Sequence, residues 1–242
     1  ELITDAFNKM LARMKVLDES RSEFVSNVSH ELKTPMTSMK VLADSLVGQH
    51  GVPEDLYQEF MRDITAEIDR ENRIITLVKM DKKNADLQIQ HMSINQLLED
   101  ILKRLRPIAD KRNIDLILDS FRPVEADVDE LKFTSAISNL VENAIKYNVD
   151  DGWVRVSLDA DHKFFYVTVA DSGMGIPEDS LSRIFERFYR VDKSHSREIG
   201  GTGLGLAITR STIGMHHGVI KVFSKEGEGT TFSVRVPLSY IP

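Results

Sequence analysis

The segment FFYVTVADSGMGIP (164–177) places a carboxylate and two glycines where a strand is predicted to end. Asp171 closes the alternating pattern of that strand, and Gly173 and Gly175 follow it. A carboxylate in this place can accept a hydrogen bond from an exocyclic amine such as that of adenine, and glycines let the backbone approach a planar ring closely. Asp-Ser-Gly is also good turn chemistry, so the segment alone favours an ordinary turn.

A second glycine-rich segment, EIGGTGLGLAITRS (198–211), leads into a predicted helix. Free amides at a helix N-terminus form an anion site suited to phosphate. The chain lacks the GxxxxGK[ST] of a P-loop, the GxGxxG of dinucleotide-binding folds and the His-Arg-Asp of protein kinases, which argues against those folds. A further pair, Gly227 and Gly229, can be a hairpin turn and nothing more.

The stretch ELKFTSAISNLVENAIKYNV (130–149) predicts a helix with one polar and one apolar face. At about 100° per residue, Asn139, Asn143 and Lys146 fall on one face. The other face is apolar and carries Phe133, Ile137, Leu140, Val141 and Ala144. Taken alone, three polar residues on one helix face more often form a solvated surface than a site.

The stretch VSNVSHELKTPMT (25–37) places His30 in a helical pattern, beside Glu31. An imidazole has an unperturbed pKa of about 6.5, so at neutral pH a ring nitrogen can attack phosphorus without prior activation. Pro35 suggests a helix end, but the apolar periodicity continues beyond it toward Leu46. The stretch alone does not decide between an ordinary polar histidine and a reactive one.

The first part of the chain predicts two helices joined by a short turn. Apolar residues recur at steps of three and four from Ile3 toward Leu46, stop at GQHGVPED (48–55) and resume as far as Lys82. Such a hairpin has too little core to be stable alone. We therefore expect two chains to pair their hairpins into a four-helix bundle.

The polar, aperiodic stretch MDKKNADLQ (80–88) predicts a domain boundary, beyond which strands and helices are mixed. Helices are predicted at 101–113, 130–147 and 204–216, and strands at 114–119, 153–159, 164–171, 219–224 and 230–238. This pattern predicts an α+β arrangement in which helices cover one face of a mixed sheet.

Composition narrows the classes of function. The 242 residues carry a net charge of −7 with both signs interspersed, which argues against nucleic acid and anionic membrane surfaces as partners. The absence of cysteine excludes disulfides, thiolate metal sites and a cysteine nucleophile, and fits a reducing compartment. No apolar run approaches the roughly 18 residues that span a bilayer.

The order of the motifs in the second half is more specific than any one of them. They resemble the N, first glycine, F, second glycine and third glycine boxes of the ATP-binding domain of histidine kinases, over about residues 90–238: NLVENAIKY, DSGMGIP, IFERFYR, GGTGLGLA and GEGTTF. The resemblance implies the α+β sandwich shared with DNA gyrase, the large heat-shock chaperone and MutL-type repair proteins. It also implies ATP and Mg²⁺ as cofactors.

The resemblance assigns roles to individual residues. Asn143 would hold Mg²⁺, Asn139 and Lys146 would serve metal and phosphates, and Asp171 would accept the adenine amine. A neutral amide suits this metal, because the triphosphate already supplies negative charge. The implied nucleotide-binding residues are Asn139, Asn143, Lys146, Tyr147, Asp171, Gly173, Gly175, Ile176, Phe188, Arg190, Gly201, Thr202, Gly203, Leu204, Gly205 and Thr231.

The tract RFYRVDKSHSREIGGT (187–202) lacks strong periodicity and resembles the flexible ATP lid of the family. Lids of this kind gate the site by closing over the ligand. Phe185, Phe188 and Tyr189 are candidate anchors, although aromatics at helical spacing more often belong to the core. Arg190 and Arg197 are candidate phosphate contacts.

With an ATP site downstream, SHELKTP resembles the H box of the dimerisation and histidine phosphotransfer domain, over about residues 19–82. The resemblance implies a homodimer in which His30 accepts the phosphoryl group and Glu31 accepts a proton. It further implies transfer to an aspartate on the receiver domain of a response regulator. Thr34, one helical turn beyond His30, would position water for a phosphatase activity.

The opening ELITDAFNKMLARM (1–14) resembles the last helix of a HAMP linker, with a generic coiled-coil lead-in as the alternative. We therefore expect three parts: 1–18 as the end of a HAMP linker or signal helix, 19–82 as the phosphotransfer domain and 90–242 as the ATP-binding domain. The chain would then be the cytoplasmic portion of a membrane-anchored sensor, tied to the membrane only through upstream segments.

Two other functions stay open. An ATPase machine of the same fold would need a glutamate four residues before its Mg²⁺ asparagine to activate water, and this chain has Asn139 there. An amide is a poor general base, so transfer to a side chain is favoured over hydrolysis. A non-catalytic dimeric scaffold is the other alternative, and it is disfavoured because no box residue is degenerate.

Overall fold

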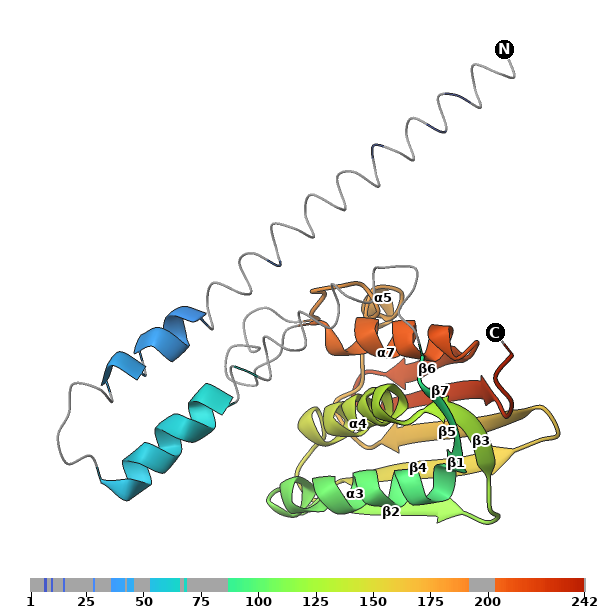
Figure 1. Cartoon of the computed structure of the whole chain (residues 1–242), viewed down its shortest axis with the longest axis horizontal. Coiled ribbons are helices and arrows are strands. Elements are labelled where there is room, and N and C mark those ends of the chain that lie inside the picture. The colour runs from blue at the N-terminus through green and yellow to red at the C-terminus, as the bar shows by residue number, and fades with distance from the viewer. Residues whose placement is uncertain are drawn as a thin grey trace. The chain divides into compact units, whose positions relative to one another are not determined.

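The computed structural model of the chain describes residues 87–191 and 203–241, together with 36–41, 43–45, 53–65 and the single positions 7, 10, 15, 28 and 68 (Figure 1). Residue contacts divide the chain into two compact units, Glu1–Asp81 and Lys82–Pro242.

The described residues of the first unit are helical on both sides of the predicted turn. Residues 36–41, 43–45 and 54–65 lie in helices, and the backbone N–H of Tyr57 donates to the carbonyl of Pro53 at 3.0 Å. Helix thus occurs where the apolar periodicity predicts it. Among the described residues, no helix is both long and apolar enough to cross a membrane.

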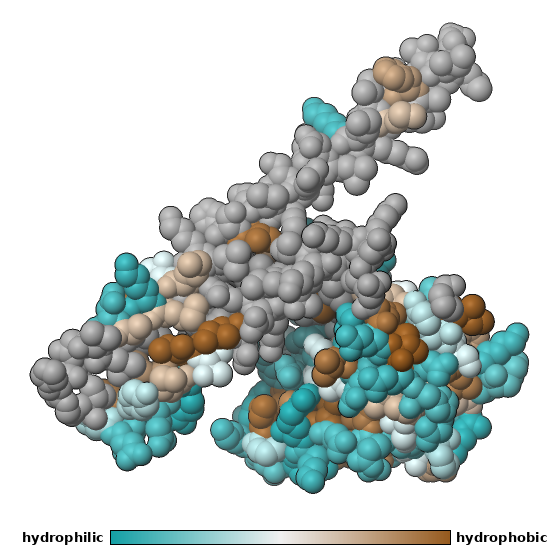
Figure 2. Space-filling model, viewed as in Figure 1, coloured by the Kyte–Doolittle hydropathy of each residue, from teal (hydrophilic) through white to brown (hydrophobic). Residues whose placement is uncertain are grey.

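Within a single chain, this unit leaves apolar side chains uncovered. Met36, Val41 and Met61 are 61 %, 58 % and 42 % exposed. Figure 2 shows tan and brown side chains at the surface of the described helical segments. Apolar surface of this kind on a helix is stabilised by contact with another helix.

The second unit is built on a five-stranded mixed sheet with the order β2-β4-β5-β7-β6. The strands are β2 (Asp115–Ser120), β4 (Trp153–Ala160), β5 (Phe164–Asp171), β6 (Val219–Lys225) and β7 (Gly229–Pro237). β2 and β4 are parallel, and the other neighbours are antiparallel. Each of these strands lies within a residue or two of its predicted position.

Three helices lie over one face of this sheet (Figure 1). They are α3 (Ile94–Asp110), α4 (Glu130–Lys146) and α7 (Gly205–Met215), and α5 (Glu178–Leu181) is a short helix between β5 and α7. Alternate residues of β5 are buried beneath the helices, and Phe165 meets Phe133 of α4 edge to face at 5.6 Å. The predicted α+β sandwich is confirmed, although α3 begins well before the predicted residue 101.

A second, two-stranded sheet was not expected from the sequence. It pairs β1 (Ile89–Ser93) with β3 (Glu125–Asp129) in antiparallel register. β3 has the sequence EADVD. Because acidic residues are depleted in strands, this sequence does not predict one. Each strand ends on the N-cap of the next helix: Ser93 accepts from Gln96 N and Asp129 from Lys132 N. The Asp129 cap therefore fixes where α4 starts.

His216 lies at the C-terminal end of α7 and is 1 % exposed. Its Nδ1 lies 2.8 Å from the carbonyl of Thr212, and its Nε2 accepts the backbone N–H of Asp129 at 3.0 Å. Both bonds are satisfied by the neutral ring with the proton on Nδ1. Burial lowers the pKa of His216 below 6.5, because a charged ring would lose its hydration and place an N–H against the N–H of Asp129.

We therefore expect acid to destabilise the second unit through His216. Below pH ~6.5 the unfolded chain binds a proton that the folded chain refuses, so the free energy of unfolding falls by up to about 1.4 kcal/mol per pH unit until the folded pKa is reached. Urea unfolding between pH 7.5 and 5.5 checks this. His216→Gln should flatten the slope and His162→Gln, an exposed turn residue, should not. Equal slopes in the two variants would contradict the assignment.

Candidate nucleotide-binding site

The polar face of α4 holds the residues expected to contact metal and phosphate. Asn139, Asn143 and Lys146 are half-buried, whereas the apolar residues of the opposite face are buried, as the angular count predicts. No hydrogen bond from a described residue occupies the side-chain amide of Asn143. That amide is therefore available to a ligand.

Asp171 ends β5 with its carboxylate buried and held in one orientation. Its Oδ1 accepts two backbone N–H groups, from Gly173 at 2.8 Å and from Thr230 at 3.2 Å. Burial raises the pKa of Asp171, and these two hydrogen bonds oppose the rise. Among the described residues none donates to Oδ2, so this oxygen can accept a hydrogen bond from a ligand amine.

The first glycine box packs closely between the end of α4 and the β6–β7 turn. A Cβ on Gly173 would lie 2.4 Å from the carbonyl oxygen of Tyr147, and Gly175 has a φ of +71° against the backbone of Lys225. The N–H of Met174 donates to the carbonyl of Tyr147, and that of Gly227 to the carbonyl of Met174. The third glycine box is thus a hairpin turn whose backbone also bonds to the first glycine box.

The register of β7 places Thr230 beside Asp171. Thr230 is buried on the helix-covered face, and Thr231, opposite Ala170, points to the other face of the sheet. The Oγ of Ser224 accepts the N–H of Ile176 at 2.8 Å, lies 2.9 Å from the hydroxyl of Thr230 and donates to the carbonyl of Gly229. The sequence predicts a nucleotide contact at Thr231. The alternation of apolar residues along β7 was the signal that places its neighbour Thr230, and not Thr231, on the buried face beside Asp171.

A backbone hydrogen bond joins the described residues at the two sides of the predicted lid. The N–H of Phe188 donates to the carbonyl of Gly203 at 3.0 Å, and both residues have positive φ, +63° and +67°. The Tyr189 hydroxyl donates to Ser180 at 3.0 Å. Partial burial raises the pKa of Tyr147, and the positive charge of Arg190 opposes this rise. Arg197, Gly201 and Thr202 lie outside the described residues.

The start of α7 packs against the N box. Leu204 is buried, and a Cβ on Gly205 would lie 2.2 Å from Oδ1 of Asn139. The Nδ2 of Asn139, on α4, donates to the hydroxyl of Thr209, which lies on α7 with Gly205, at 3.1 Å. The second glycine box and the polar face of α4 are therefore in direct contact, as a shared phosphate site requires.

The expected phosphotransfer residues, His30, Glu31 and Thr34, lie outside the described residues. Their roles stay predictions.

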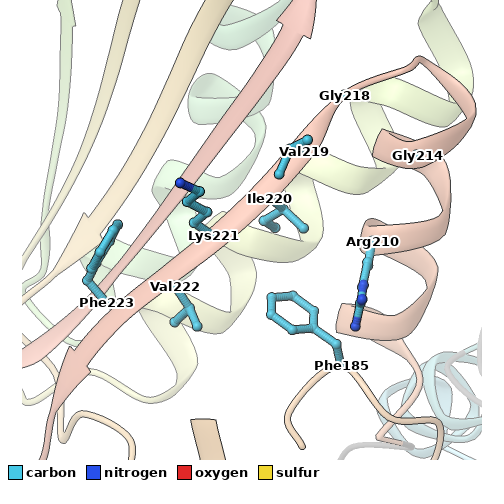
Figure 3. A pocket seen from close by; sticks show the side chains of 9 residues that line it. All are labelled: Phe185, Arg210, Gly214, Gly218, Val219, Ile220, Lys221, Val222 and Phe223. Atoms are coloured by element: carbon cyan, nitrogen blue, oxygen red, sulfur yellow. The ribbon is translucent and has the colours of Figure 1, made fainter. Parts of the chain in front are cut away.

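A separate groove of about 550 Å³ lies between α7 and the edge strand β6 (Figure 3). Phe185, Arg210, Ile220 and Phe223 are among its lining residues, which include none of the expected nucleotide-binding residues that the structure describes.

The site offers one contact for the base of a nucleotide and another for its metal and phosphates. Asp171 Oδ2 suits an exocyclic amine, and the amides of α4 suit a metal that keeps phosphate and water oxygens as further ligands. The described residues include no group of three His, Cys, Asp or Glu that could hold a metal alone. A bound Mg²⁺ would therefore depend on the phosphates of its nucleotide.

Comparison with known proteins decides the family. Residues 20–83 match the His Kinase A (phospho-acceptor) domain, and residues 128–240 match the histidine kinase-, DNA gyrase B- and HSP90-like ATPase domain. The chain belongs to the sensor histidine kinases. The ATPase-type domain supports the use of ATP.

Two curated relatives of the kinase are similar over most of the chain. The sensor histidine kinase WalK of Bacillus subtilis is 34 % identical over 228 residues, which cover 91 % of the chain and 37 % of WalK. The sensor-like histidine kinase SenX3 of Mycolicibacterium smegmatis is 35 % identical over 225 residues, covering 91 % and 58 %. The chain thus spans about a third to three-fifths of the length of these relatives.

One solved structure with a similar fold holds a kinase and a partner. Histidine kinase ThkA, in complex with response regulator protein TrrA, has a TM-score of 0.66 at 24 % identity and covers 94 % of the chain and 63 % of ThkA. At this identity the likeness shows the fold.

Proposed function

We propose that this chain is the catalytic portion of a sensor that transfers the γ-phosphoryl group of ATP to His30 and then to an aspartate of a response regulator. One observation carries the proposal: Oδ2 of Asp171 and the amide of Asn143 both lack described protein partners, and the turn after Asp171 bonds to the end of the helix that carries Asn143. One ligand with an amine at one end and phosphates at the other satisfies both.

The nucleotide is held from its two ends. Asp171 accepts the adenine amine, and the backbone of Gly173 and Gly175 lies against the ring. Asn143 and Asn139 would hold Mg²⁺, and the chemistry that this metal would supply is neutralisation of phosphate charge. The cations of Lys146 and Arg190 stabilise the charge that develops on the transferred oxygens. The remaining box and lid residues close around the ligand: Tyr147, Ile176, Phe188, Gly201, Thr202, Gly203, Leu204 and Gly205. Thr230, the neighbour of Thr231 on β7, contributes beside Asp171 in place of Thr231.

The transfer itself is a displacement at phosphorus. A ring nitrogen of His30 attacks the γ-phosphorus, a P–N bond forms, and the bond to the oxygen shared with the β-phosphate breaks. ADP leaves with that electron pair. Glu31 accepts the proton from the other ring nitrogen and stabilises the positive charge on the ring. Thr34, four residues after His30 in the predicted helix, positions water when the regulator is dephosphorylated.

The first unit acts as a homodimer. Its exposed described side chains, among them Met36 and Val41, are the apolar surface that a second hairpin would cover in a four-helix bundle. The receiver domain of a response regulator is the second partner. Residues 1–18 end a HAMP linker, residues 19–82 form the phosphotransfer domain and residues 90–242 the ATP-binding domain, so that the chain is the cytoplasmic portion of a sensor anchored in the cell membrane upstream.

Labelled ATP separates this function from its two rivals. The purified chain, incubated with Mg²⁺ and ATP labelled on the γ-phosphate, should acquire an acid-labile, alkali-stable protein label. An ATPase machine would instead release free phosphate steadily without labelling the protein. A scaffold would do neither. Either of these last two results would overturn the kinase proposal.

The contact between Gly205 and Asn139 gives a sharp test of the metal site. In Gly205→Ala the new methyl group would meet the Asn139 amide, which must rotate and lose its bond to Thr209. Because Asn139 would be displaced from the metal that it is proposed to hold, and losing even an outer partner of a metal site costs 10–100-fold, we expect MgATP affinity to fall by about tenfold. Isothermal titration measures this. Gly214→Ala is the matched control, since it lies on the same helix with open space around it. Unchanged affinity in Gly205→Ala would contradict the role of Asn139.

A further inference from the structure

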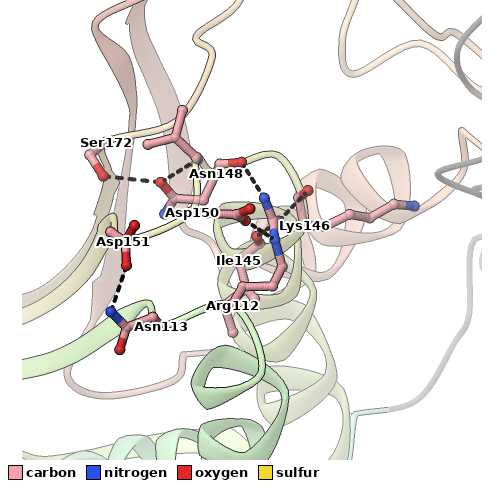
Figure 4. Close-up of polar contacts among 9 residues, drawn as sticks. Arg112, Asn113, Ile145, Lys146, Asn148, Asp150, Asp151 and Ser172 are labelled. Atoms are coloured by element: carbon pink, nitrogen blue, oxygen red, sulfur yellow. Dashed lines mark hydrogen bonds and ion pairs between the residues drawn. The ribbon is translucent and has the colours of Figure 1, made fainter.

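The C-terminal end of α4 is closed by a side chain from a distant turn. The last carbonyls of a helix have no partner within it. Here Arg112 is the missing donor: one guanidinium nitrogen, Nη1, donates to the carbonyls of Ile145 at 2.8 Å and Lys146 at 3.1 Å. The other, Nη2, donates to the carbonyl of Asn148 at 2.8 Å (Figure 4). These three carbonyls flank Tyr147, the last residue of the N box.

Arg112 is itself held in place. Its backbone N–H donates to Ala109 at the end of α3, and its carbonyl accepts the N–H of Asp151. Its Nε donates to Asp150 at 2.8 Å. These bonds fix both the backbone from which the side chain extends and the orientation of its guanidinium. Its planar fork matches acceptors spread over several residues, which a lysine ammonium cannot reproduce.

A second set of bonds joins the same helix end to the turn after Asp171. The Asn148 side chain accepts from the hydroxyl of Ser172 at 3.0 Å and donates to the carbonyl of Trp153 at 3.0 Å. Ser172 in turn accepts the N–H of Trp153 at 2.8 Å. The end of α4 is thus fastened on one side by Arg112 and on the other to the residue next to Asp171 (Figure 4).

We propose that Arg112 is a positioning residue of the nucleotide site: by capping the last turn of α4 it fixes the N box, and Lys146 in particular, relative to the carboxylate of Asp171. This inference rests on the proposed function, in which Lys146 contacts phosphate and Asp171 contacts adenine. Arg112 does not touch the nucleotide and acts through the helix end.

The test measures MgATP affinity in Arg112→Gln and Arg112→Lys by isothermal titration. We expect a loss of at least tenfold in Arg112→Gln and a smaller loss in Arg112→Lys, because lysine can still reach one carbonyl. Arg122→Gln is the matched control. Its guanidinium donates to Asp159 at 2.7 Å on the exposed surface, and its removal should change affinity less than twofold.

A double-mutant cycle with Lys146→Ala separates positioning from general destabilisation. If Arg112 acts by placing Lys146, then Arg112→Gln should cost less than threefold in affinity once Lys146 is gone. The same tenfold loss in both backgrounds, or no loss in either, would overturn the inference. Failure of the unmodified chain to bind MgATP would overturn the proposed function, and this inference with it. Arg112→Lys keeps the test valid should Arg112→Gln fail to fold.

Discussion

Replacing His30 with glutamine should abolish covalent labelling of the chain by γ-labelled ATP. Glutamine is close to histidine in size and polarity but has no ring nitrogen with a lone pair that can attack phosphorus. Because a missing nucleophile cannot be replaced by its neighbours, we expect the initial labelling rate to fall by at least about a thousandfold. The rate is measured by filter binding after an alkaline quench.

Two measurements make this result specific. MgATP affinity should be unchanged in His30→Gln, because the nucleotide residues all lie in the second unit, Lys82–Pro242. His162→Gln, which alters an exposed histidine in the turn between β4 and β5, should label at the normal rate. Label that persists in His30→Gln, or that disappears in His162→Gln, would show that another residue accepts the phosphoryl group.

Changing Asp171 to asparagine should remove nucleotide binding with little change in the fold. The amide oxygen can still accept the two N–H groups that hold Oδ1, from Gly173 and Thr230. The other atom becomes an NH₂ donor that faces the donor amine of the base. Two donors that face each other leave both buried groups without an acceptor. A site built to hydrogen-bond a ligand group favours that ligand by 10⁴–10⁵ over one that cannot make the bond. We expect a loss of at least a hundredfold in MgATP affinity, measured by titration calorimetry.

Asp161→Asn is the control for this change. Asp161 lies near the start of β5 and also accepts two backbone N–H groups, from Lys163 and Phe164, which together with the Tyr166 hydroxyl lower its pKa to about 2. Its substitution should reduce stability without changing affinity. Near-normal affinity in Asp171→Asn would mean that the adenine amine binds elsewhere.

The sequence could predict those features that follow from local periodicity. The apolar and polar faces of α4 follow from the spacing of its own residues. The helix observed over Glu130–Lys146 places Asn139, Asn143 and Lys146 on one face, as predicted. The alternation in β4 through β7 likewise locates the main sheet. These patterns are strong because each is set by one element packing against one core.

The features that sequence analysis missed depend on contacts between distant residues. β1 and β3 are short and pair only with each other, so neither carries a strong pattern. Arg112 lies more than thirty residues from the carbonyls it caps, and a side chain that bonds to backbone leaves no signature at the positions it contacts. The choice between Thr230 and Thr231 depends on strand register, which the third glycine box alone does not fix.

The direct passage from β3 into α4 limits how this region can change during evolution. Asp129 is at once the last residue of the strand and the cap of the helix, with no loop between them. One residue inserted or deleted there would rotate every later position of α4 by about 100° and carry Asn143 away from Asp171. Length variation among descendants of this chain should therefore concentrate at surface turns such as that around His162, while the β3–α4 junction keeps its length.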